Sequence, residues 1–310
     1  MSQAKLIDFH SEEKREILEV FRTIPYMDKW IATLVENFIY AFVQIFYDNG
    51  ILKEEYGIKY TDIHGEYKEW DKTGRPLVHT VYNSGQLHGL YKEFYRMENS
   101  PLHFELNYAN GLRHGDFKDW YPSGQLSSQV TYIDGKRQGL RTIWYSTGEI
   151  MDQEIYVDDQ LHGEYKRYYK SGQLQCQVIC VNGNRHGEYK ECREDGRPLV
   201  QSIYVHGLLH GVYKQFHQME NSQLHLEWNY ADGLLHGEQK EWYSSGHLHK
   251  KYYTLHGKKE GECKVWYGNG QLQMHFTYVN NEAHGEFRKW DNHGNLLEII
   301  IYNNGVEVRN

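Results

Sequence analysis

Hydrophobic and polar residues alternate in short segments along most of the chain. In residues 272–278, Leu272, Met274, Phe276 and Tyr278 fall on one side of an extended backbone, and the polar residues between them fall on the other. Segments of this kind are separated by short stretches rich in Gly, Asn and Asp. A period of two bounded by turn residues predicts half-buried β-strands in consecutive hairpins.

A heptapeptide typified by HGEYKEW recurs through the same region. Its glycine falls at steps of 24 or 26 residues, at Gly65, Gly89, Gly115, Gly139, Gly163, Gly187, Gly211, Gly237, Gly261 and Gly285. With one earlier copy that starts near Ala41, the spacing predicts eleven repeats over residues 41–310. The MENS and GRPLV segments each recur 122 residues apart, so residues 187–308 are interpreted as a copy of the five-repeat block 65–186.

Each repeat also contains a second turn, usually Asn-Gly or Asp-Gly, before the next heptapeptide. Asp159 and Asn281 replace the glycine in two repeats. Asn and Asp are the non-glycine residues that best tolerate a positive φ, so the replacement predicts a left-handed turn position. The heptapeptide itself is interpreted as a strand together with the turn that leads into it.

The chain resembles the MORN-repeat superfamily, in its variant of about 22–24 residues per repeat. The resemblance lies in three motifs that follow one another in each repeat: HGEYKEWY, then GQL, then a tyrosine followed by NG. The resemblance implies a mainly β fold, an elongated and twisted single antiparallel sheet of stacked β-hairpins. Each hairpin needs its neighbours to bury its aromatic face. Repeats of this variant occur in bacterial and giant-virus proteins, and the resemblance is specific for fold rather than for function.

Residues 1–40 follow a different pattern, which predicts a short N-terminal helical cap. Ser11 and Asp28 are suited to begin two helices separated by Pro25, and the apolar residues of 31–39 follow helical spacing. Two alternatives stay open for this region: a membrane anchor over the apolar stretch 30–47, and a degenerate F-box-like pair of helices.

The C-terminal segment 296–305 is strongly apolar and is expected to be the last strand of the sheet. Its centre is Ile299, Ile300 and Ile301. An uncovered strand edge is a template for pairing with another chain. We therefore expect self-association, or docking of a protein partner, through this edge.

The bulk composition narrows the classes of function. The net charge of −8 argues against nucleic-acid binding, which needs clustered basic charge. The polar first residues do not resemble a signal peptide, and the four cysteines form no CxxC pair. We expect an intracellular, cytoplasmic location, or association with the virion if the protein is viral.

The histidines and cysteines predict no catalytic, cofactor or metal site. His precedes eight of the heptapeptide glycines, but equivalent positions in adjacent repeats lie about 10 Å apart, which is too far to share one metal ion. Cys180, Cys192 and Cys263 stand where other repeats have aromatic residues, so they are predicted to be small core residues.

A basic residue recurs three positions after the glycine and forms what we call the basic ladder. Its members are Lys68, Lys92, Lys118, Lys166, Lys190, Lys214, Lys240, Lys264 and Arg288. A linear basic stripe of this kind is suited to an anionic membrane surface. Against that interpretation, an acidic residue two positions earlier in most copies would lie on the same strand face and neutralise the stripe.

The two 26-residue repeats replace a tight glycine turn with a longer loop. These loops contain Met97, Glu98, Asn99 and Ser100 in one repeat, and Met219, Glu220, Asn221 and Ser222 in the other. Loops on a rigid scaffold often carry function. The two loops are therefore predicted to be equivalent docking points for a partner.

These features together favour a non-enzymatic scaffold or protein–protein interaction module, as a structural component of a larger assembly. The first alternative is a peripheral membrane adaptor that binds anionic lipid through the basic ladder. The second, suggested by the label attached to some family members, is an antitoxin-like binder of a partner protein.

Overall fold

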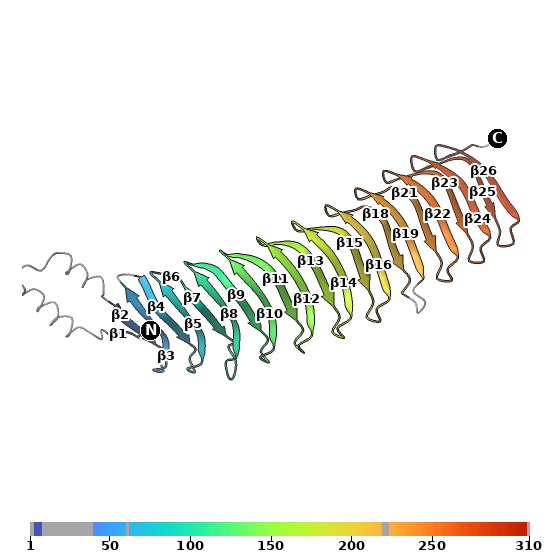
Figure 1. Ribbon diagram of the computed structural model, residues 1–310. Coiled ribbons are helices and arrows are strands. Elements are labelled where there is room, and N and C mark those ends of the chain that lie inside the picture. Colours follow the sequence, from blue (N-terminus) through green and yellow to red (C-terminus); the bar gives the residue numbers. More distant parts are fainter. Residues whose placement is uncertain (1–2, 8–39, 60–61, 219–222, 309–310) are drawn as a thin grey trace, which may run out of the picture. The chain divides into compact units, whose positions relative to one another are not determined.

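The computed structural model describes residues 3–7, 40–59, 62–218 and 223–308 of the 310-residue chain (Figure 1). Every regular element within these ranges is a β-strand. The chain divides into two compact units, one of residues 1–149 with 157–159 and one of residues 150–156 with 160–310. The expected mainly β class is confirmed.

The first unit is an antiparallel sheet in which strands pair in the order of the sequence. Its strands are β1 (Gln3–Ile7), β2 (Tyr40–Phe46), β3 (Leu52–Lys59), β4 (Asp62–Trp70), β5 (Pro76–Asn83), β6 (Gln86–Leu87), β7 (Gly89–Phe94), β8 (Leu102–Ala109), β9 (Leu112–Trp120), β10 (Leu126–Ile133) and β11 (Lys136–Trp144). The consecutive pairing confirms the antiparallel hairpin sheet that the sequence predicts.

The second unit follows the same plan. Its strands are β12 (Ile150–Val157), β13 (Gln160–Tyr168), β14 (Leu174–Val181), β15 (Asn184–Cys192), β16 (Pro198–Val205), β17 (Leu208–Leu209), β18 (Gly211–Phe216), β19 (Leu224–Ala231), β20 (Leu234–Leu235), β21 (Gly237–Trp242), β22 (Leu248–Leu255), β23 (Lys258–Trp266), β24 (Leu272–Val279), β25 (Glu282–Trp290), β26 (Leu296–Asn303) and β27 (Val306–Val308). Successive hairpins lie beside one another in chain order in Figure 1.

In most repeats the heptapeptide glycine lies at a bulge inside a strand and not in a turn, which corrects the interpretation from the sequence. Gly187 has a φ of 80° within β15, at a register shift where Val178 pairs with Tyr189 but the next residue, Ile179, pairs with His186. A bulge residue in the left-handed region is best filled by glycine, because it has no Cβ to clash with the backbone. The repeated glycine therefore sets the bend of each hairpin.

The second turn is left-handed at both central positions, as predicted. Its first residue is Asn or Asp in most repeats, with φ close to 50°, as at Asn110 and Asp134. The glycine that follows also has a positive φ, and the replacements Asp159 and Asn281 have values of 68° and 75°. Two positive φ values in succession are typical of a type I′ hairpin turn, whose twist matches that of the flanking strands.

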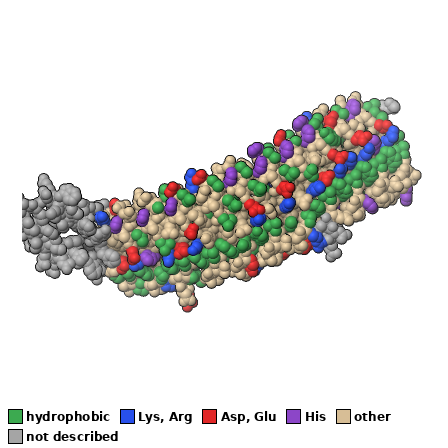
Figure 2. All heavy atoms as spheres, viewed as in Figure 1, with side chains coloured by type: hydrophobic (Ala, Val, Ile, Leu, Met, Phe, Trp, Pro, Cys, Tyr) green, Lys and Arg blue, Asp and Glu red, His purple; other side chains and the backbone are tan. Residues whose placement is uncertain are grey.

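The two faces of each sheet differ in burial. The basic ladder lies on one side, which we call the ladder face. The opposite side, the aromatic face, contains residues such as Tyr67 and holds the five largest fully buried side chains, Leu106, Gln239, Thr80, Thr254 and Cys263. Figure 2 shows hydrophobic side chains in bands across successive strands, with charged side chains among them.

The predicted N-terminal cap is corrected in part. Residues 3–7, which the prediction included in the cap of residues 1–40 but placed before its first helix, form strand β1. This strand pairs with β2 in antiparallel register from Gln3–Phe46 to Ile7–Phe42. The rest of the cap, residues 8–39, lies outside the described residues, and so does most of the apolar stretch 30–47. In the part of the chain that is described, no helix has the length and apolarity to cross a membrane.

Candidate functional site

The basic ladder is largely paired with carboxylates. Within six strands, the basic group contacts the acidic residue two positions earlier: Lys68–Glu66 at 2.6 Å, Lys166–Glu164 at 2.7 Å, Lys190–Glu188 at 3.1 Å, Lys240–Glu238 at 2.6 Å, Lys264–Glu262 at 2.7 Å and Arg288–Glu286 at 2.7 Å. The hydrogen bond from Lys68 is the main cause of the lowered pKa of Glu66. The acidic residues that precede the ladder residues by two positions therefore pair with them, and little net charge is left on these strands.

The two 26-residue repeats break this arrangement. Leu90 and Val212 occupy the position of the acid. Lys214 contacts Glu227 on the neighbouring strand instead, at 3.7 Å. Lys92, the equivalent residue in the first unit, has no carboxylate oxygen within 4.0 Å among the described residues. The anion-binding role of the ladder stays a prediction, now for a stripe in which most members are paired.

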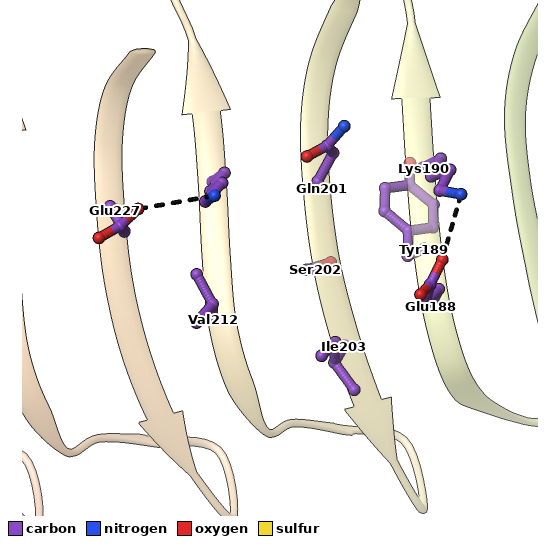
Figure 3. Close-up of a pocket in the computed structure, with 9 residues that line it drawn as sticks. Glu188, Tyr189, Lys190, Gln201, Ser202, Ile203, Val212 and Glu227 are labelled. Carbon is purple, nitrogen blue, oxygen red and sulfur yellow. Dashed lines mark ion pairs between the residues drawn. The ribbon is translucent and has the colours of Figure 1, made fainter.

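A shallow groove of about 430 Å³ opens on the ladder face of the second unit at this break (Figure 3). It crosses β15, β16, β18 and β19 and is lined by Glu188, Tyr189, Lys190, Gln201, Ser202, Ile203, Val212, Lys214 and Glu227. Ile203 and Val212 lie on adjacent strands and are 40% and 38% exposed. Ile179, on the same face of β14, is 49% exposed, so the groove continues an apolar surface bordered by lysines.

One of the two predicted docking loops is described. Met97 is 42% exposed, whereas Ser100 is buried and its backbone N–H donates to the Met97 carbonyl at 3.1 Å. Asn99 and Ser100 both have positive φ, so the loop bends sharply. The second loop, Met219 to Ser222, lies outside the described residues. The docking role of either loop stays a prediction.

The C-terminal edge differs from the expected arrangement, because β26 is not the last strand. Strand β27 pairs with it through Ile301–Val308, Tyr302–Glu307 and Asn303–Val306. Ile299 and Ile301 point to the ladder face and are 51% and 44% exposed, whereas Ile300 is half-buried opposite Phe287. The predicted edge is therefore partly covered, and its exposed apolar residues lie on one face.

The repeated histidines contact the turn of their own repeat. His162 Nδ1 lies 3.2 Å from Asn182 Oδ1, and His284 Nδ1 lies 3.1 Å from Asn304 Oδ1. Among the described residues, no group of three or more His, Cys, Asp or Glu side chains is placed to hold a metal ion. All four cysteines are free; Cys180 and Cys263 are buried and Cys192 is half-buried. Burial raises the pKa of the Cys263 thiol.

The strand pattern, bulges and turns agree with a match to a known family. The family model for the MORN repeat variant matches residues 113–134, 161–179, 235–256, 259–280 and 283–304. The chain carries MORN repeats. The resemblance drawn from the sequence is confirmed in these five segments. Each segment begins at the second residue of a strand, two positions before the repeated glycine.

The comparison with solved structures adds little to the MORN assignment. The chain is similar to the crystal structure of TcdB2-TccC3 without its hypervariable C-terminal region, with 13% identity, 84% of this chain and 17% of that chain covered, and a TM-score of 0.20. It is also similar to TcdB2-TccC3-Cdc42, with 12% identity, 86% and 22% coverage and a TM-score of 0.14. The chain spans less than a quarter of those structures, and such TM-scores support no argument. A comparison with curated proteins finds no match.

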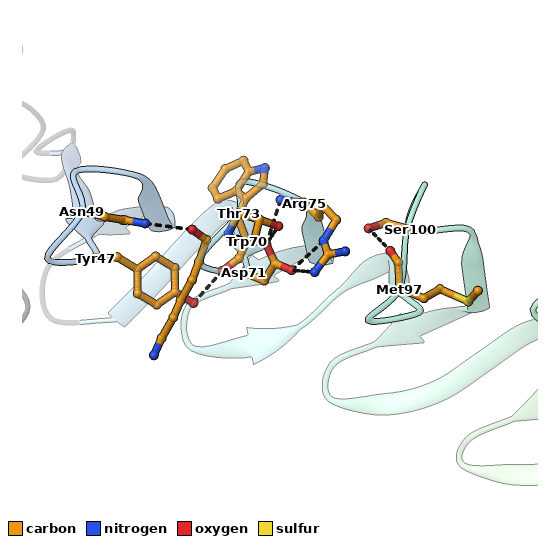
Figure 4. Close-up of polar contacts among 9 residues, drawn as sticks. Tyr47, Asn49, Trp70, Asp71, Thr73, Arg75, Met97 and Ser100 are labelled. Atoms are coloured by element: carbon orange, nitrogen blue, oxygen red, sulfur yellow. Dashed lines mark hydrogen bonds and ion pairs between the residues drawn. The ribbon is translucent and has the colours of Figure 1, made fainter.

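A contact between successive repeats was missed by reasoning from the sequence. Tyr47 Oη donates to the Trp70 carbonyl at 2.9 Å, which joins the turn of one repeat to the strand of the next (Figure 4). Equivalent bonds to Trp120, Trp144, Cys192, Trp266 and Trp290 come from Tyr95, Tyr121, Tyr169, Tyr243 and Tyr267. The signal was present, because a tyrosine follows the aromatic strand residue directly in these repeats.

Proposed function

We propose that this MORN-repeat chain is a non-enzymatic scaffold that binds a protein partner on the ladder face of its second unit. The supporting observation is the groove at Ile203 and Val212, where the acid of the ladder is replaced by an exposed aliphatic side chain. Contiguous exposed apolar surface with a polar border is typical of protein-interaction sites. MORN repeats suggest a protein of protein- or lipid-interaction type, and the groove favours protein.

The paired ladder argues against the lipid alternative. Membrane attraction contributes about 1 kcal/mol per free basic residue near an anionic surface. Six ladder members contact a carboxylate of their own strand, so the net charge presented to a membrane is small. A membrane adaptor would need those ion pairs to open.

The test is native purification with the amount of each co-purifying protein quantified for three forms of the chain. We expect a stoichiometric partner with the unmodified chain, and its loss when Ile203→Glu and Val212→Glu are combined. The matched control is Ile133→Glu, a substitution in the first unit at a residue that is 49% exposed. Equal partner recovery from all three forms, or salt-sensitive binding to phosphatidylserine vesicles without a protein partner, would contradict the proposal.

A second candidate is self-association at the C-terminal strands, which the exposure of Ile299 and Ile301 supports. Charged side chains on strand edges oppose edge pairing. We expect Ile299→Lys with Ile301→Lys to convert a dimer to a monomer in sedimentation equilibrium. An unchanged mass in solution would reject this interface.

A further inference from the structure

In several repeats the first turn residue contacts the histidine that precedes the repeated glycine. His162 Nδ1 lies 3.2 Å from Asn182 Oδ1, and His210 Nδ1 lies 3.4 Å from Asp232 Oδ1. Both turn residues have a φ of 50°, so they hold their side chains in the same way. The repeat therefore aims the Nδ1 atom of its histidine at the side chain of the turn residue.

Two repeats of the second unit have a histidine at this turn position instead of Asn or Asp. These are His206 and His256, with φ values of 51° and 49°. The ring centre of His256 lies 5.0 Å from that of His236, and the ring centre of His206 lies 5.6 Å from that of His186. Each pair joins two different positions of one repeat, so the spacing of about 10 Å between equivalent histidines does not apply to it.

The rings of His236 and His256 have the separation of two ligands of one metal ion. An ion at about 2.0–2.1 Å from one nitrogen of each ring lies about 3.2 Å from each ring centre. With the centres 5.0 Å apart, the angle at the ion is about 100°, which is near the tetrahedral value. The ring planes are inclined by 63°, whereas those of His217 and His225 are stacked at 30°, with nearly parallel lone pairs.

The Nδ1 atom of His236 is available as a ligand. It is buried and makes no hydrogen bond to any described residue. A buried polar atom without a partner is costly, and the unprotonated nitrogen of a neutral imidazole is a common metal ligand. His256 is exposed, so an ion can reach the pair from solvent. No third His, Cys, Asp or Glu of the described residues is placed to join the pair.

We propose that His236 and His256 bind one divalent ion of a late first-row transition metal, with water in the other coordination positions. Imidazole nitrogen suits Ni²⁺, Cu²⁺ and Zn²⁺, whereas Mg²⁺ and Ca²⁺ take oxygen ligands. His186 and His206, whose rings lie farther apart, form a second and weaker site of the same kind. This inference goes beyond the protein scaffold, because the histidines lie outside the groove that supports the scaffold proposal.

The probe is Ni²⁺ alone, titrated by calorimetry into the full-length chain without an affinity tag. Ni²⁺ is chosen because the four free cysteines do not reduce it, as they can reduce Cu²⁺. We expect one ion at each pair, the tighter with a Kd below about 100 μM. His256→Asn puts back a turn residue of other repeats and so preserves the hairpin, and it should weaken the tighter site at least about tenfold. Paramagnetic broadening should be strongest for the ring signals of His236 and His256.

The matched control is His284→Gln. His284 precedes its repeated glycine as His236 does, but its Nδ1 lies 3.1 Å from Asn304 Oδ1, so its loss should leave Ni²⁺ binding unchanged. Tight binding that survives His256→Asn, or that falls equally with His284→Gln, would overturn the proposal. Equally tight binding of Mg²⁺ would overturn it in favour of carboxylate ligands.

A gain of binding gives an independent test. Asn182→His places an imidazole opposite His162, where the repeat already aims Nδ1 at the turn residue. We expect this variant to bind one more Ni²⁺ than the unmodified chain, with broadening of the His162 ring signals. A variant that folds and binds no further ion would show that two facing imidazoles on this hairpin do not form a site, which contradicts the proposal.

Discussion

A pocket of about 470 Å³ beside Arg141, on the aromatic face of the first unit, and the core around Cys263 occupy corresponding positions, 122 residues apart, in the two proposed five-repeat blocks. In the first block, Phe117 and Arg141 line an open cavity. In the second block, Gln239 and Cys263 stand at the same positions, and each has no exposed surface. The same strand plan therefore supports an open polar pocket in one unit and a closed core in the other.

In the second block, the position of the pocket is filled by hydrogen-bonded and closely packed side chains. Gln239 Nε2 donates to Thr254 Oγ1 at 2.8 Å, and its Oε1 accepts from the Asn229 backbone N–H at 2.9 Å. Cys263 forms a core cluster with Tyr252 and Val265, against which Met274 and Phe276 pack. A small thiol leaves room for these larger neighbours, whereas an arginine at that position in the first block has a cavity beside it.

This difference shows that one set of positions determines the strand arrangement of the repeat, and another set determines whether a pocket is present. The bulge glycine and the turn residues fix where each strand lies. They have the same left-handed backbone conformation at corresponding positions of both blocks, even where the residue differs, as at Asp134 and His256. The residue two positions after the bulge, together with its neighbours across the strands, decides whether the aromatic face is filled or open. One repeat can therefore differ from the others in its aromatic face without a change in the scaffold.

Exchanging Arg141 and Cys263 between the two blocks should have the largest effect on the free energy of unfolding. Cys263→Arg places a cation at a position with no exposed surface, between Tyr252 and Phe276. A buried charge without a partner costs about 3–5 kcal/mol. We expect the free energy of unfolding to fall by about 3 kcal/mol or more in urea denaturation, with faster amide exchange in β23 and β24.

The reverse exchange, Arg141→Cys, is the control. It removes a charge from the edge of a cavity, and we expect a change below about 1 kcal/mol in the same assay. Equal costs for the two exchanges would mean that the pocket and the core are not different environments. A stable Cys263→Arg chain would show that the second core opens as readily as the first.

Removing the tyrosine hydrogen bonds between repeats should lower the free energy of unfolding by a smaller amount, and by the same amount in both blocks. Tyr121 and Tyr243 are corresponding residues, and each Oη donates to a tryptophan carbonyl of the next repeat, at 2.8 and 2.9 Å. Tyr→Phe at either site removes one hydrogen bond, which contributes about 1 kcal/mol. We expect matched losses in urea denaturation. A large loss at one site alone would show that the two blocks differ in the scaffold as well as in the face.

The scaffold was predictable because its signals are local. Alternation gave the strands, and the Asn-Gly and Asp-Gly pairs gave the left-handed turns, including Asp159 and Asn281. The bulge at Gly187 was not predicted, because a turn and a bulge both favour glycine and a single sequence does not distinguish them. Strand β27 was missed since its three residues follow a turn at the end of the chain with too short a pattern to assign.

The Arg141 pocket was not predictable in the same way. Arg113, Arg137, Arg141 and Asp159 come from three successive hairpins, and only strand register and side-chain direction bring them together. One local signal did exist, because Arg141 replaces an aromatic residue. The groove had a similar signal in Val212, which replaces an acid. Departures from the repeat were thus the informative positions for both sites.

The smallest expected effect concerns pH and a pair of corresponding histidines. In the first block, the His103 ring nitrogens lie 3.5 Å from Glu93 Oε1 and 3.7 Å from Asp119 Oδ1. In the second block, Gln215 stands at the position of Glu93, and His225 stacks on His217 at 4.3 Å between ring centres. Burial is the main cause of the lowered pKa of His225.

The other charged groups around His225 add to this shift or oppose it. His217 and His249 also lower its pKa, and Glu241 opposes them. Because the folded pKa lies below the unfolded value of about 6.5, the unfolded state takes up the proton first. Stability in this region should therefore fall as the pH drops through about 6.5 towards the folded pKa. Amide exchange measured at about pH 7.5 and 5.5 should show β18 and β19 losing more protection than β7 and β8.

His217→Tyr tests the cause of that difference, because it restores the tyrosine that the first block has at Tyr95. Tyrosine is neutral across this range and can donate to the Trp242 carbonyl, which His217 Nε2 now contacts at 3.1 Å. The substitution removes one lowering influence on the pKa of His225 but leaves its burial. The pH dependence of β18 and β19 should shrink without disappearing. A pH response that is unchanged by His217→Tyr would assign the whole effect to burial, and an equal response in β7 and β8 would remove the contrast between the blocks.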